Sequence, residues 1–597
     1  MRRTVFLVVA GAVAAFAVWY VWRISQKTSS ASVSALLPRE TIFLAHLPDL
    51  NRTRDQWHHS DLYLLYREPA VQDFLRKPLA KLPKKDAASQ TLHEIEQLDP
   101  KNAFFALTSM ANDSPKIVVG FRFRENQNNA EKIITGWCSE ALGDPSARET
   151  IDYQRRKIHI FTFGLFSLAS VYDRNWFFAS NNLAEIKALL DRADGRVKNA
   201  KNTLDADESY RAAAAHMPSS YAASFYLQPQ TLSARLAALR AAIQSSGATN
   251  ERPLLEQVRS ISGAMRFESG KIHDLLFLGV PKLEQDTAIT RSSLTLGTKE
   301  TFFYLSMLLN VGQKIDALNQ AAGIAGTMQK FFQTFSDSGI TADDWKAAFG
   351  VELGSLADWP STAPWPSLIL TLPVIDMARA SKIVEAVTRA DENAIWTQTE
   401  KDSVRYFSMP SSATLIAITP TIALSNRILI AGFNPVSVEE AIKRDDSVSS
   451  ELSNSQAYKT AAKLVPSPTN FFAYIDASQL YSRLDGSLRP MLLMAAAFMP
   501  GMTDYIDLTR LPAPEVITKH LSPIVSSQRY DGDGYVAESV GPITLGQSAI
   551  GLAILSGVGA TARQKASANL TGWGPSSMGT PQPSLNPSST PNPAPTP

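Results

Sequence analysis

Met217-Pro218-Ser219-Ser220-Tyr221-Ala222-Ala223-Ser224-Phe225-Tyr226-Leu227 and Val465-Pro466-Ser467-Pro468-Thr469-Asn470-Phe471-Phe472-Ala473-Tyr474-Ile475 are the two stretches that decide the fold. Each is a proline-led turn followed by a run of residues typical of a strand. A short helical pattern precedes each, at residues 209–213 and 457–461. Position 457 follows position 209 by 248 residues, and position 465 follows position 217 by the same 248 residues. The sequence therefore predicts one structural unit that occurs twice.

Other elements recur in the same order around these blocks. Glu-Thr at 40–41 and again at 300–301 precedes an apolar strand, and Asp49 is placed to cap a helix that reaches Trp57. A strand pattern at 115–121 precedes a helix pattern at 130–134, as 366–372 precedes 380–384. We therefore expect two repeats, at residues 36–285 and 286–541.

The last element predicted in each repeat is a β-hairpin. Its turn lies at residues 268–271 in the first repeat and at residues 531–534, Asp-Gly-Asp-Gly, in the second. Aspartates at alternate positions also begin an EF-hand calcium loop, but no acidic residue follows at the later ligand positions. We interpret residues 531–534 as a plain turn.

The spacing of the strands indicates the fold class. Strand patterns at 157–163, 168–172 and 176–180 follow one another too closely for parallel crossovers, so they must pair antiparallel. A helix is expected at 183–193, on one face of the sheet. The prediction is an α+β fold of two tandem homologous domains, with curved antiparallel sheets covered by helices, plus an N-terminal transmembrane helix.

The N-terminal 35 residues are predicted to be a membrane anchor and tether. Residues 5–22 are eighteen consecutive uncharged residues, which as a helix cover roughly 27 Å and can span a bilayer. Arg2 and Arg3 favour a cytoplasmic N-terminus. A cleaved signal peptide is the alternative, but no small-residue cleavage site follows Trp22 directly. We therefore expect a single-pass protein of the cell membrane, with the lipid bilayer as a partner and the body outside the cytoplasm.

Two further segments follow the second repeat. Residues 542–562 are apolar, glycine-rich and uncharged, which fits a second membrane helix near the C-terminus. The alternatives are an apolar element docked on the body and a re-entrant or interfacial membrane segment. Residues 563–597 are rich in Pro, Ser and Thr and are expected to be a disordered tail.

Charge and cysteine content exclude several classes of function. The net charge is +2 and basic residues are interspersed with acids, so nucleic acid is not an expected partner. The basic stretch at 76–85 fits contact with anionic lipid or a cell-wall polymer, or simply a solvated helix end. Cys138 is the sole cysteine, which excludes an internal disulfide, and its surroundings suggest a packed thiol.

The search for catalytic and binding motifs returns no site residues. Phosphate loops, dinucleotide fingerprints and the Gly-x-Ser-x-Gly elbow are absent, so neither a cofactor nor a catalytic or metal-binding residue is expected. His58 and His59 are adjacent and would point in different directions on a helix, which suits chelation poorly. Trp345, Trp359 and Trp365 fit either a stacking surface for a glycan or peptide, or core packing.

Four short motifs stand out near the two ends of the body: the proline-led strand from Leu37-Pro38 to Leu47-Pro48-Asp49-Leu50, then His520-Leu521-Ser522-Pro523, Asp533-Gly534-Tyr535 and Glu538-Ser539-Val540-Gly541-Pro542. Together they resemble the bacterial membrane-anchored families of extracytoplasmic domains of unknown function. The likeness covers roughly residues 36–545, and it implies a membrane-tethered extracytoplasmic protein without known catalytic residues.

These patterns lead to one functional expectation and two alternatives. The expectation is a non-enzymatic binding or scaffolding protein of the bacterial envelope, in contact with another envelope protein or a cell-wall polymer. One alternative is an envelope hydrolase, which predicts a deep cleft between the two repeats, lined by polar residues that differ from one repeat to the other. The other is an accessory factor in secretion or membrane-protein assembly.

Overall fold

The structure is a computed structural model that describes residues 32–80, 85–110, 115–164, 166–196, 202–230, 258–282, 287–308, 340–389, 395–409, 418–445, 450–498 and 507–547. Residues as far as Leu545 belong to one compact unit, and residues 546–597 belong to another. The predicted N-terminal span, most of the 542–562 segment and the 563–597 tail lie outside the described residues. Within the described residues, no helix has both the length and the apolar character that a membrane span requires.

Twenty described strands form one antiparallel sheet, which confirms the α+β class. Across the first half the order is β4 (Ala147–Tyr153), β5 (Arg156–Phe163), β6 (Phe166–Asp173), β7 (Trp176–Ser180), β3 (Lys116–Arg122), β2 (Lys101–Ser109), β1 (Phe43–Asp49), β8 (Ala223–Leu227), β9 (Ser260–Glu268) and β10 (Lys271–Gly279). The second half continues with β20 (Tyr535–Gly541), β19 (Ile524–Tyr530), β18 (Phe471–Ile475), β11 (Thr301–Leu308), β12 (Glu352–Asp358), β13 (Ser367–Pro373), β17 (Ile428–Gly432), β16 (Thr421–Leu424), β15 (Val404–Ser408) and β14 (Thr397–Lys401).

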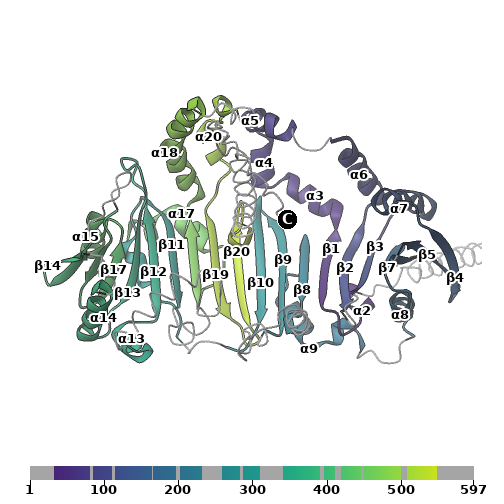
Figure 1. Cartoon of the computed structure of the whole chain (residues 1–597), viewed down its shortest axis with the longest axis horizontal. Coiled ribbons are helices and arrows are strands. Elements are labelled where there is room, and N and C mark those ends of the chain that lie inside the picture. Colours follow the sequence, from purple (N-terminus) through teal and green to yellow (C-terminus); the bar gives the residue numbers. More distant parts are fainter. Residues whose placement is uncertain are drawn as a thin grey trace, which may run out of the picture. The chain divides into compact units, whose positions relative to one another are not determined.

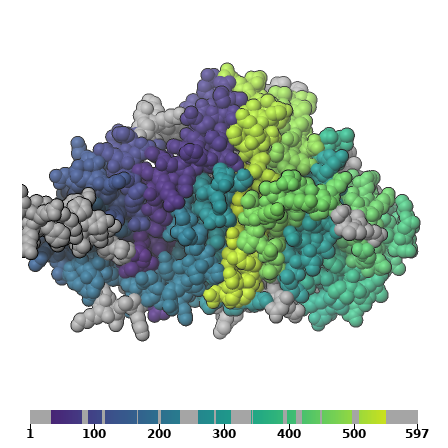
Figure 2. Space-filling view, turned by 180° about the vertical axis from the view of Figure 1, so that it is seen from behind, coloured from purple at the N-terminus to yellow at the C-terminus, as the bar shows by residue number. Residues whose placement is uncertain are grey.

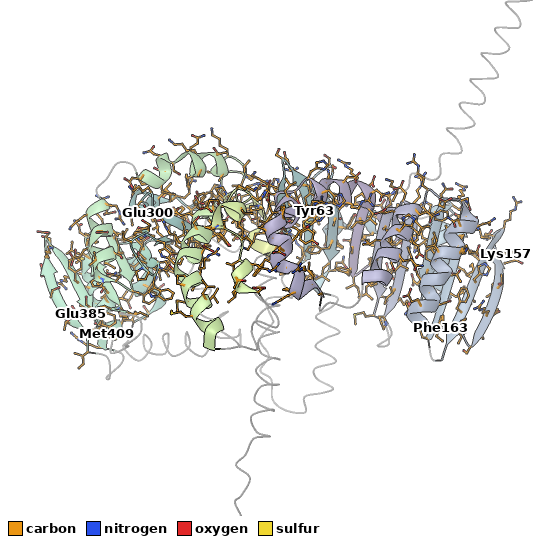
Figure 3. All side chains as sticks on the ribbon, turned by 90° about the horizontal axis from the view of Figure 1, so that it is seen from above. Tyr63, Lys157, Phe163, Glu300, Glu385 and Met409 are labelled. Atoms are coloured by element: carbon orange, nitrogen blue, oxygen red, sulfur yellow. The ribbon has the colours of Figure 1, made fainter. Side chains whose placement is uncertain are left out.

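The strand order is therefore the same in both halves when each is read from its outer edge toward the middle. The halves join where β10 pairs with β20, over seven residue pairs from Ile272–Gly541 to Leu278–Tyr535, and we call this junction the seam. Figure 1 follows the strands across the sheet from β4 to β14. In Figure 3, Lys157 and Phe163 of β5 lie near the β4 edge of the sheet. Glu385, on a helix of the second half, and Met409, which follows β15, lie near the opposite edge. A separate sheet was expected in each repeat, whereas the seam makes one continuous sheet.

Strand register places a local two-fold axis at the seam. One row of directly opposed residues runs through Phe104, His46, Ser224, Ala264 and Leu275 in the first half. The matching row in the second half runs through Gly354, Ser306, Phe472, Ser527 and Glu538. The two rows meet because Leu275 pairs with Glu538. Residues at the same position of each half can therefore be compared directly.

Helices connect the strands and cover the sheet. In the first half they are α2 (Val33–Leu36), α3 (Leu50–His58), α4 (Asp61–Arg67), α5 (Pro69–Ala80), α6 (Lys85–Leu98), α7 (Gln127–Leu142), α8 (Leu183–Ala193), η3 (Leu204–Ala206) and α9 (Glu208–Ala215). In the second half they are η5 (Ser292–Leu296), α13 (Ala342–Ala348), α14 (Met377–Arg389), α15 (Pro435–Arg444), α16 (Glu451–Asn454), α17 (Gln456–Ala462), α18 (Ala477–Phe498), η6 (Leu508–Arg510) and α20 (Pro514–Thr518).

Side-chain caps fix where several helices begin. Asp49 accepts a hydrogen bond from the backbone N–H of Arg52, so it is the N-cap of α3 as the sequence predicts. Asn182 caps α8 and Asn434 caps α15 with nearly the same backbone geometry, φ −138° and −139°. These asparagines hold matching helices against matching strands of the two halves.

Each half buries its own hydrophobic core beneath these helices. The core of the first half includes Leu44, Phe104, Phe178, Leu189 and Tyr226. It also includes Phe277 of β10 and Val536 of β20, so it continues across the seam. Full burial of one large apolar side chain contributes roughly 1.5–3 kcal/mol to the free energy of unfolding, so the shared core stabilises the junction of the two halves substantially.

Polar contacts between helices strengthen the junction. Glu68, at the end of α4, accepts from Lys519 Nζ at 2.8 Å and lies 2.7 Å from Nε2 of His520. On α5, Asp73 pairs with Arg510 at 2.5 Å and Lys77 pairs with Asp507 at 3.5 Å. Figure 2 shows the yellow C-terminal strands directly beside the teal strands of the first half. The first residues of the basic stretch are thus paired within the body.

Candidate functional site

A cavity of about 280 Å³ lies in the first half, between the sheet and the segment that contains α9. We call it the α9 pocket. Its floor is formed by Leu44 and His46 of β1, Ser224 and Tyr226 of β8, and Ser262 of β9. Its other walls come from α2 with the preceding residue, from α9, from the loop after α9 and from one further residue of β8. These residues are Ser32, Val33, Ser34, Tyr210, Ala213, Ala214, Met217, Pro218, Ser219, Tyr221 and Phe225.

The strand register explains why the floor residues share one face. Tyr226 pairs with Leu44 on one side and with Ser262 on the other, and directly opposed residues of a sheet point to the same face. His46 pairs with Ser224 two positions along, where the side chains return to that face. The floor therefore carries polar side chains at positions that the sheet would otherwise fill with core residues.

His46 is held by a second polar residue of the pocket. Its Nδ1 and the hydroxyl of Tyr221 are hydrogen-bonded at 2.8 Å, and the two rings meet edge to face with centroids 5.8 Å apart. Burial lowers the pKa of His46 to about 4, and a nearby side chain, Asn102, opposes this effect. The imidazole is therefore uncharged at neutral pH.

Three buried polar atoms of the floor, the hydroxyls of Tyr226 and Ser262 and Nε2 of His46, make no hydrogen bond of normal geometry with the described residues. Polar side chains nevertheless lie close to two of these residues: Asn102 is near His46, and Gln228 and Asp207 are near Tyr226. Tyr226 is 2% exposed and Ser262 is 0% exposed. Burial raises the pKa of Tyr226, with a further contribution from the charge of Asp207, so its phenol stays protonated. A buried polar group without a partner costs about 1–3 kcal/mol, which a bound molecule with matching groups would recover.

The corresponding positions of the second half are filled. Phe472 stands at the position of Ser224, Val525 at that of Ser262, and Tyr304 at that of Leu44. Phe472, Tyr304 and Val525 are 0% exposed. The ring of Phe472 lies 6.2 Å from that of Tyr304 and 6.0 Å from that of Tyr458 of α17. Aromatic packing therefore occupies in the second half the space that forms the α9 pocket in the first.

Polar groups at this place in the second half are also satisfied. Ser306, at the position of His46, donates to Oε1 of Glu352 at 2.8 Å. The other carboxylate oxygen of Glu352 accepts from the backbone and the hydroxyl of Thr290, both at 2.7 Å. In the second half, packed rings and mutually hydrogen-bonded side chains thus occupy the same framework.

The chemistry of the α9 pocket favours binding over catalysis. The described residues that line it include no carboxylate, amine, guanidinium or thiol. A histidine whose pKa is about 4 is a weak base at neutral pH, where general-base catalysis works best with a pKa near the working pH. The hydrolase alternative predicts polar residues that differ between the repeats, and the α9 pocket has them, but it lies within the first half and lacks a charged acid or base.

A second cavity, of about 260 Å³, lies between α7 and strands β4 to β7. Its walls combine apolar side chains such as Ile134 and Phe177 with charged ones such as Arg148 and Glu149, and Cys138 lines it from α7. Burial raises the pKa of the Cys138 thiol, which keeps the sulfur protonated and weakly nucleophilic. This agrees with the sequence interpretation of a packed thiol.

An open hollow of about 670 Å³ lies beside α3. Its charges are mutually paired: Lys101 Nζ lies 2.6 Å from Asp49 and 3.2 Å from Asp99. His59 also lines this hollow, with Nδ1 2.7 Å from the backbone carbonyl of Asp55. His58 instead lies against the ring of Tyr63, with centroids 4.5 Å apart. The two histidines do not converge, and among the described residues no cluster of His, Cys, Asp and Glu could hold a metal ion.

The three tryptophans singled out in the sequence do not form one surface. Trp359 is 3% exposed, packs against Phe302 and donates to the carbonyl of Ala363 at 3.1 Å. Trp345 packs on Phe349 in a different cluster, whereas Trp365 is exposed. Residues 531–534 form a hairpin turn between β19 and β20, in which Asp531 N–H donates to Gly534 O at 2.8 Å.

The α9 pocket was not predicted from the sequence, although one difference between the two repeats pointed to it. Ser224 and Phe472 occupy the same place in the two best-matched blocks, and a serine within an otherwise apolar strand marks a space. Ser262 and His46 come from strands far away in sequence, and only the folded register brings them to Tyr226.

Comparisons with known proteins add little to this description. No family model matches the chain, and no curated protein matches it. Among solved structures, those of crystal forms I and III of TP0453 are similar to it, with 5% identity and TM-scores of 0.23 and 0.24. These matches cover 43% of this chain, and 82% and 84% of the TP0453 chains.

Proposed function

We propose that this protein is a membrane-anchored, extracytoplasmic binding protein of the bacterial envelope, and that the first half binds a small molecule in the α9 pocket. The proposal includes two tandem homologous α+β domains, 36–285 and 286–541, of which the second has a packing role at the corresponding place. The equal strand order of the halves supports the duplication. The apolar residues 5–22 support the anchor.

One observation carries the binding function. The α9 pocket is walled by side chains that include three buried polar atoms without partners, at a place where the other half is packed with aromatic rings. Folded proteins satisfy almost all buried polar groups, and those left unsatisfied need a functional or structural reason. Binding a ligand supplies that reason, and neither charge nor a strong base is present for chemistry.

Replacing Ser224 by Phe tests the binding function. The full chain, purified in detergent, is screened by native mass spectrometry and calorimetry against a library of small metabolites. S224F introduces the residue found at this position in the second half, and it is expected to lower the affinity for every hit at least tenfold. S220F makes the same chemical change at an exposed position outside the pocket and should bind as the unchanged protein does. Hits that bind S224F with unchanged affinity would refute the pocket.

Protease treatment tests the location. Intact spheroplasts should allow digestion of the body from outside, whereas a cytoplasmic body would be protected until the cells are lysed. Protection in intact spheroplasts would contradict the extracytoplasmic proposal and leave the pocket to be judged by the binding experiment.

A further inference from the structure

The geometry points to an uncharged, hydroxyl-bearing ring of monosaccharide size as the ligand of the α9 pocket. This inference rests on the proposed binding function and narrows it to a chemical class. Three properties of the pocket support it: the lack of charge among the described lining residues, the hydrogen-bonding groups and the volume.

The absence of charge from the pocket walls excludes an ionic ligand. The lining residues are serines, tyrosines, aliphatic residues, Phe225, Met217, Pro218 and the single histidine His46, which is neutral at neutral pH. Asp207, the carboxylate whose charge raises the pKa of Tyr226, already has partners within the protein. It accepts a hydrogen bond from the backbone N–H of Tyr210 at 3.0 Å and pairs with Arg39 at 3.5 Å. An ion placed in the pocket would therefore lose its hydration without gaining a counter-charge, which is strongly unfavourable.

The unpartnered atoms require a ligand with several groups that both donate and accept. The hydroxyls of Tyr226 and Ser262 each combine a donor with an acceptor, and Nε2 of His46 can act as either according to its tautomer. A purely apolar ligand would leave all three unsatisfied. Ligand hydroxyl groups combine the same two roles and can satisfy all three atoms.

The shape of the pocket favours one compact ring. Its volume of about 280 Å³ is that of roughly nine water molecules at about 30 Å³ each, which is room for one hydroxylated six-membered ring. Tyr210 and Tyr226 meet edge to face with centroids 5.0 Å apart, and Leu44 and Val33 add apolar wall. Such a wall suits the C–H faces of a sugar or cyclitol ring, whose hydroxyls then reach the polar floor.

The test titrates purified full-length protein with four neutral ring probes, namely glucose, galactose, N-acetylglucosamine and myo-inositol. Glucosamine and glucuronate are the charged probes, and cyclohexane is the apolar probe. We expect at least one neutral probe to bind at one site per chain, and both charged probes and cyclohexane to bind at least tenfold more weakly. Because the second half is filled, two equivalent sites per chain would contradict the inference.

Tyr226→Phe distinguishes a ligand-binding hydroxyl from a structural one. The hydroxyl makes no hydrogen bond of normal geometry in the free protein, although Gln228 and Asp207 lie near it, so Y226F should change the melting temperature little while weakening the best neutral probe about tenfold. Tyr474→Phe is the matched control, because Tyr474 stands at the same position of the second half and its hydroxyl lies 3.4 Å from Asp476. Y474F should not change the affinity.

The outcomes separate this inference from the proposed function. Binding of a charged or apolar molecule that S224F abolishes would keep the pocket as a binding site but overturn the neutral ring as its ligand. Failure of all four neutral probes to bind would also overturn the neutral ring. If a neutral probe binds but S224F and Y226F do not change its affinity, the probe binds elsewhere. Both the α9 pocket as the binding site and the neutral ring as its ligand are then refuted.

Discussion

His273 Nε2, on β10 of the first half, lies 3.2 Å from Oε2 of Glu538, on β20 of the second. The other oxygen of Glu538 accepts from Arg529 at 3.1 Å, and Nη2 of Arg266 lies 2.8 Å from Nδ1 of His273. Both His273 and Glu538 are mostly buried, at 10% and 14% side-chain exposure. A chain of polar contacts therefore crosses the seam beside Leu275, the residue that pairs with Glu538.

Glu538→Gln should weaken the seam. His273, and then Arg529, lower the pKa of Glu538 from its ordinary value of 4.5, so the carboxylate is charged at neutral pH and its charge strengthens both contacts. We expect E538Q to lose about 1–3 kcal/mol of the free energy of unfolding at pH 7, as measured by urea titration. The contribution is fully present above pH 4.5 and is lost as the pH falls through the lower pKa of the folded state.

The control for this variant is Glu400→Gln, at an exposed position of the edge strand β14. It should change the free energy of unfolding little. Equal stability of E538Q and the unchanged protein at pH 7 would mean that the seam depends on the strand pairing and the shared core alone.

His46 should make the protein less stable in mild acid. Its pKa is lowered from 6.5 to about 4 by burial, so the unfolded chain takes up a proton between these values and the folded chain does not. The contribution of the neutral His46 ring to the free energy of unfolding is fully present above pH 6.5. As the pH decreases below 6.5, it falls by about 1.4 kcal/mol per pH unit, or about 3 kcal/mol in total by pH 4. Urea titrations between pH 7 and pH 4 should show this slope, and H46Q should reduce it.

His58→Asn, at an exposed position of α3, is the matched control for the histidine experiment. If H46Q and H58N change the pH dependence equally, the environment of the α9 pocket does not govern the titration of His46.

Gly120 on β3 is predicted to tolerate no side chain. A Cβ atom there would lie 2.6 Å from Cδ1 of Phe178 and 2.7 Å from Cε1 of Phe104, and both rings are buried. Gly120→Ala should therefore destabilise the protein by about 1–3 kcal/mol through overpacking. Gly136→Ala is the control, because a Cβ atom on Gly136 of α7 meets nothing within 4 Å. It should stabilise the helix by up to about 1 kcal/mol, and a similar loss in both variants would refute the packing argument.

Filling the α9 pocket should exchange binding for stability. The double variant S224F/S262V installs the residues of the second half and removes an unpartnered hydroxyl, so we expect the free energy of unfolding to rise by about 1–2 kcal/mol. The converse change, Phe472→Ser, opens a cavity and should cost about 3–5 kcal/mol. Thermal denaturation measures both, and a large loss in the double variant would show that the pocket backbone does not accept the aromatic ring.

Local elements were the part of the fold that sequence could predict. The cap at Asp49 and the bounds of α8 follow from residues within one turn of the helix, and both are confirmed. The hairpins β9–β10 and β19–β20 are confirmed for the same reason, since the turn residues lie between the strands they join. The predicted membrane spans and the disordered tail stay predictions.

The seam and the α9 pocket depend on contacts between residues far apart in sequence. Nothing in the pattern of residues 271–279 distinguishes an edge strand from one that pairs with a strand more than 250 residues later. The pocket likewise needs His46, Tyr226 and Ser262, from three strands, to meet on one face. Apolar periodicity predicts which residues face a core, but it does not report where that core is left unfilled.

The pairing of Leu275 with Glu538 has a consequence for how the two halves differ. Antiparallel pairing of the same strand from each half, about a local two-fold axis, is the arrangement of an isologous dimer, in which both subunits present the same patch. In a dimer of identical chains, every substitution appears twice, so a pocket opened in one subunit opens in the other. Covalent linkage of the halves removes that constraint. One half can keep a cavity while the corresponding region of the other half is filled by packed side chains. A homodimer with exact symmetry cannot have this difference between its subunits.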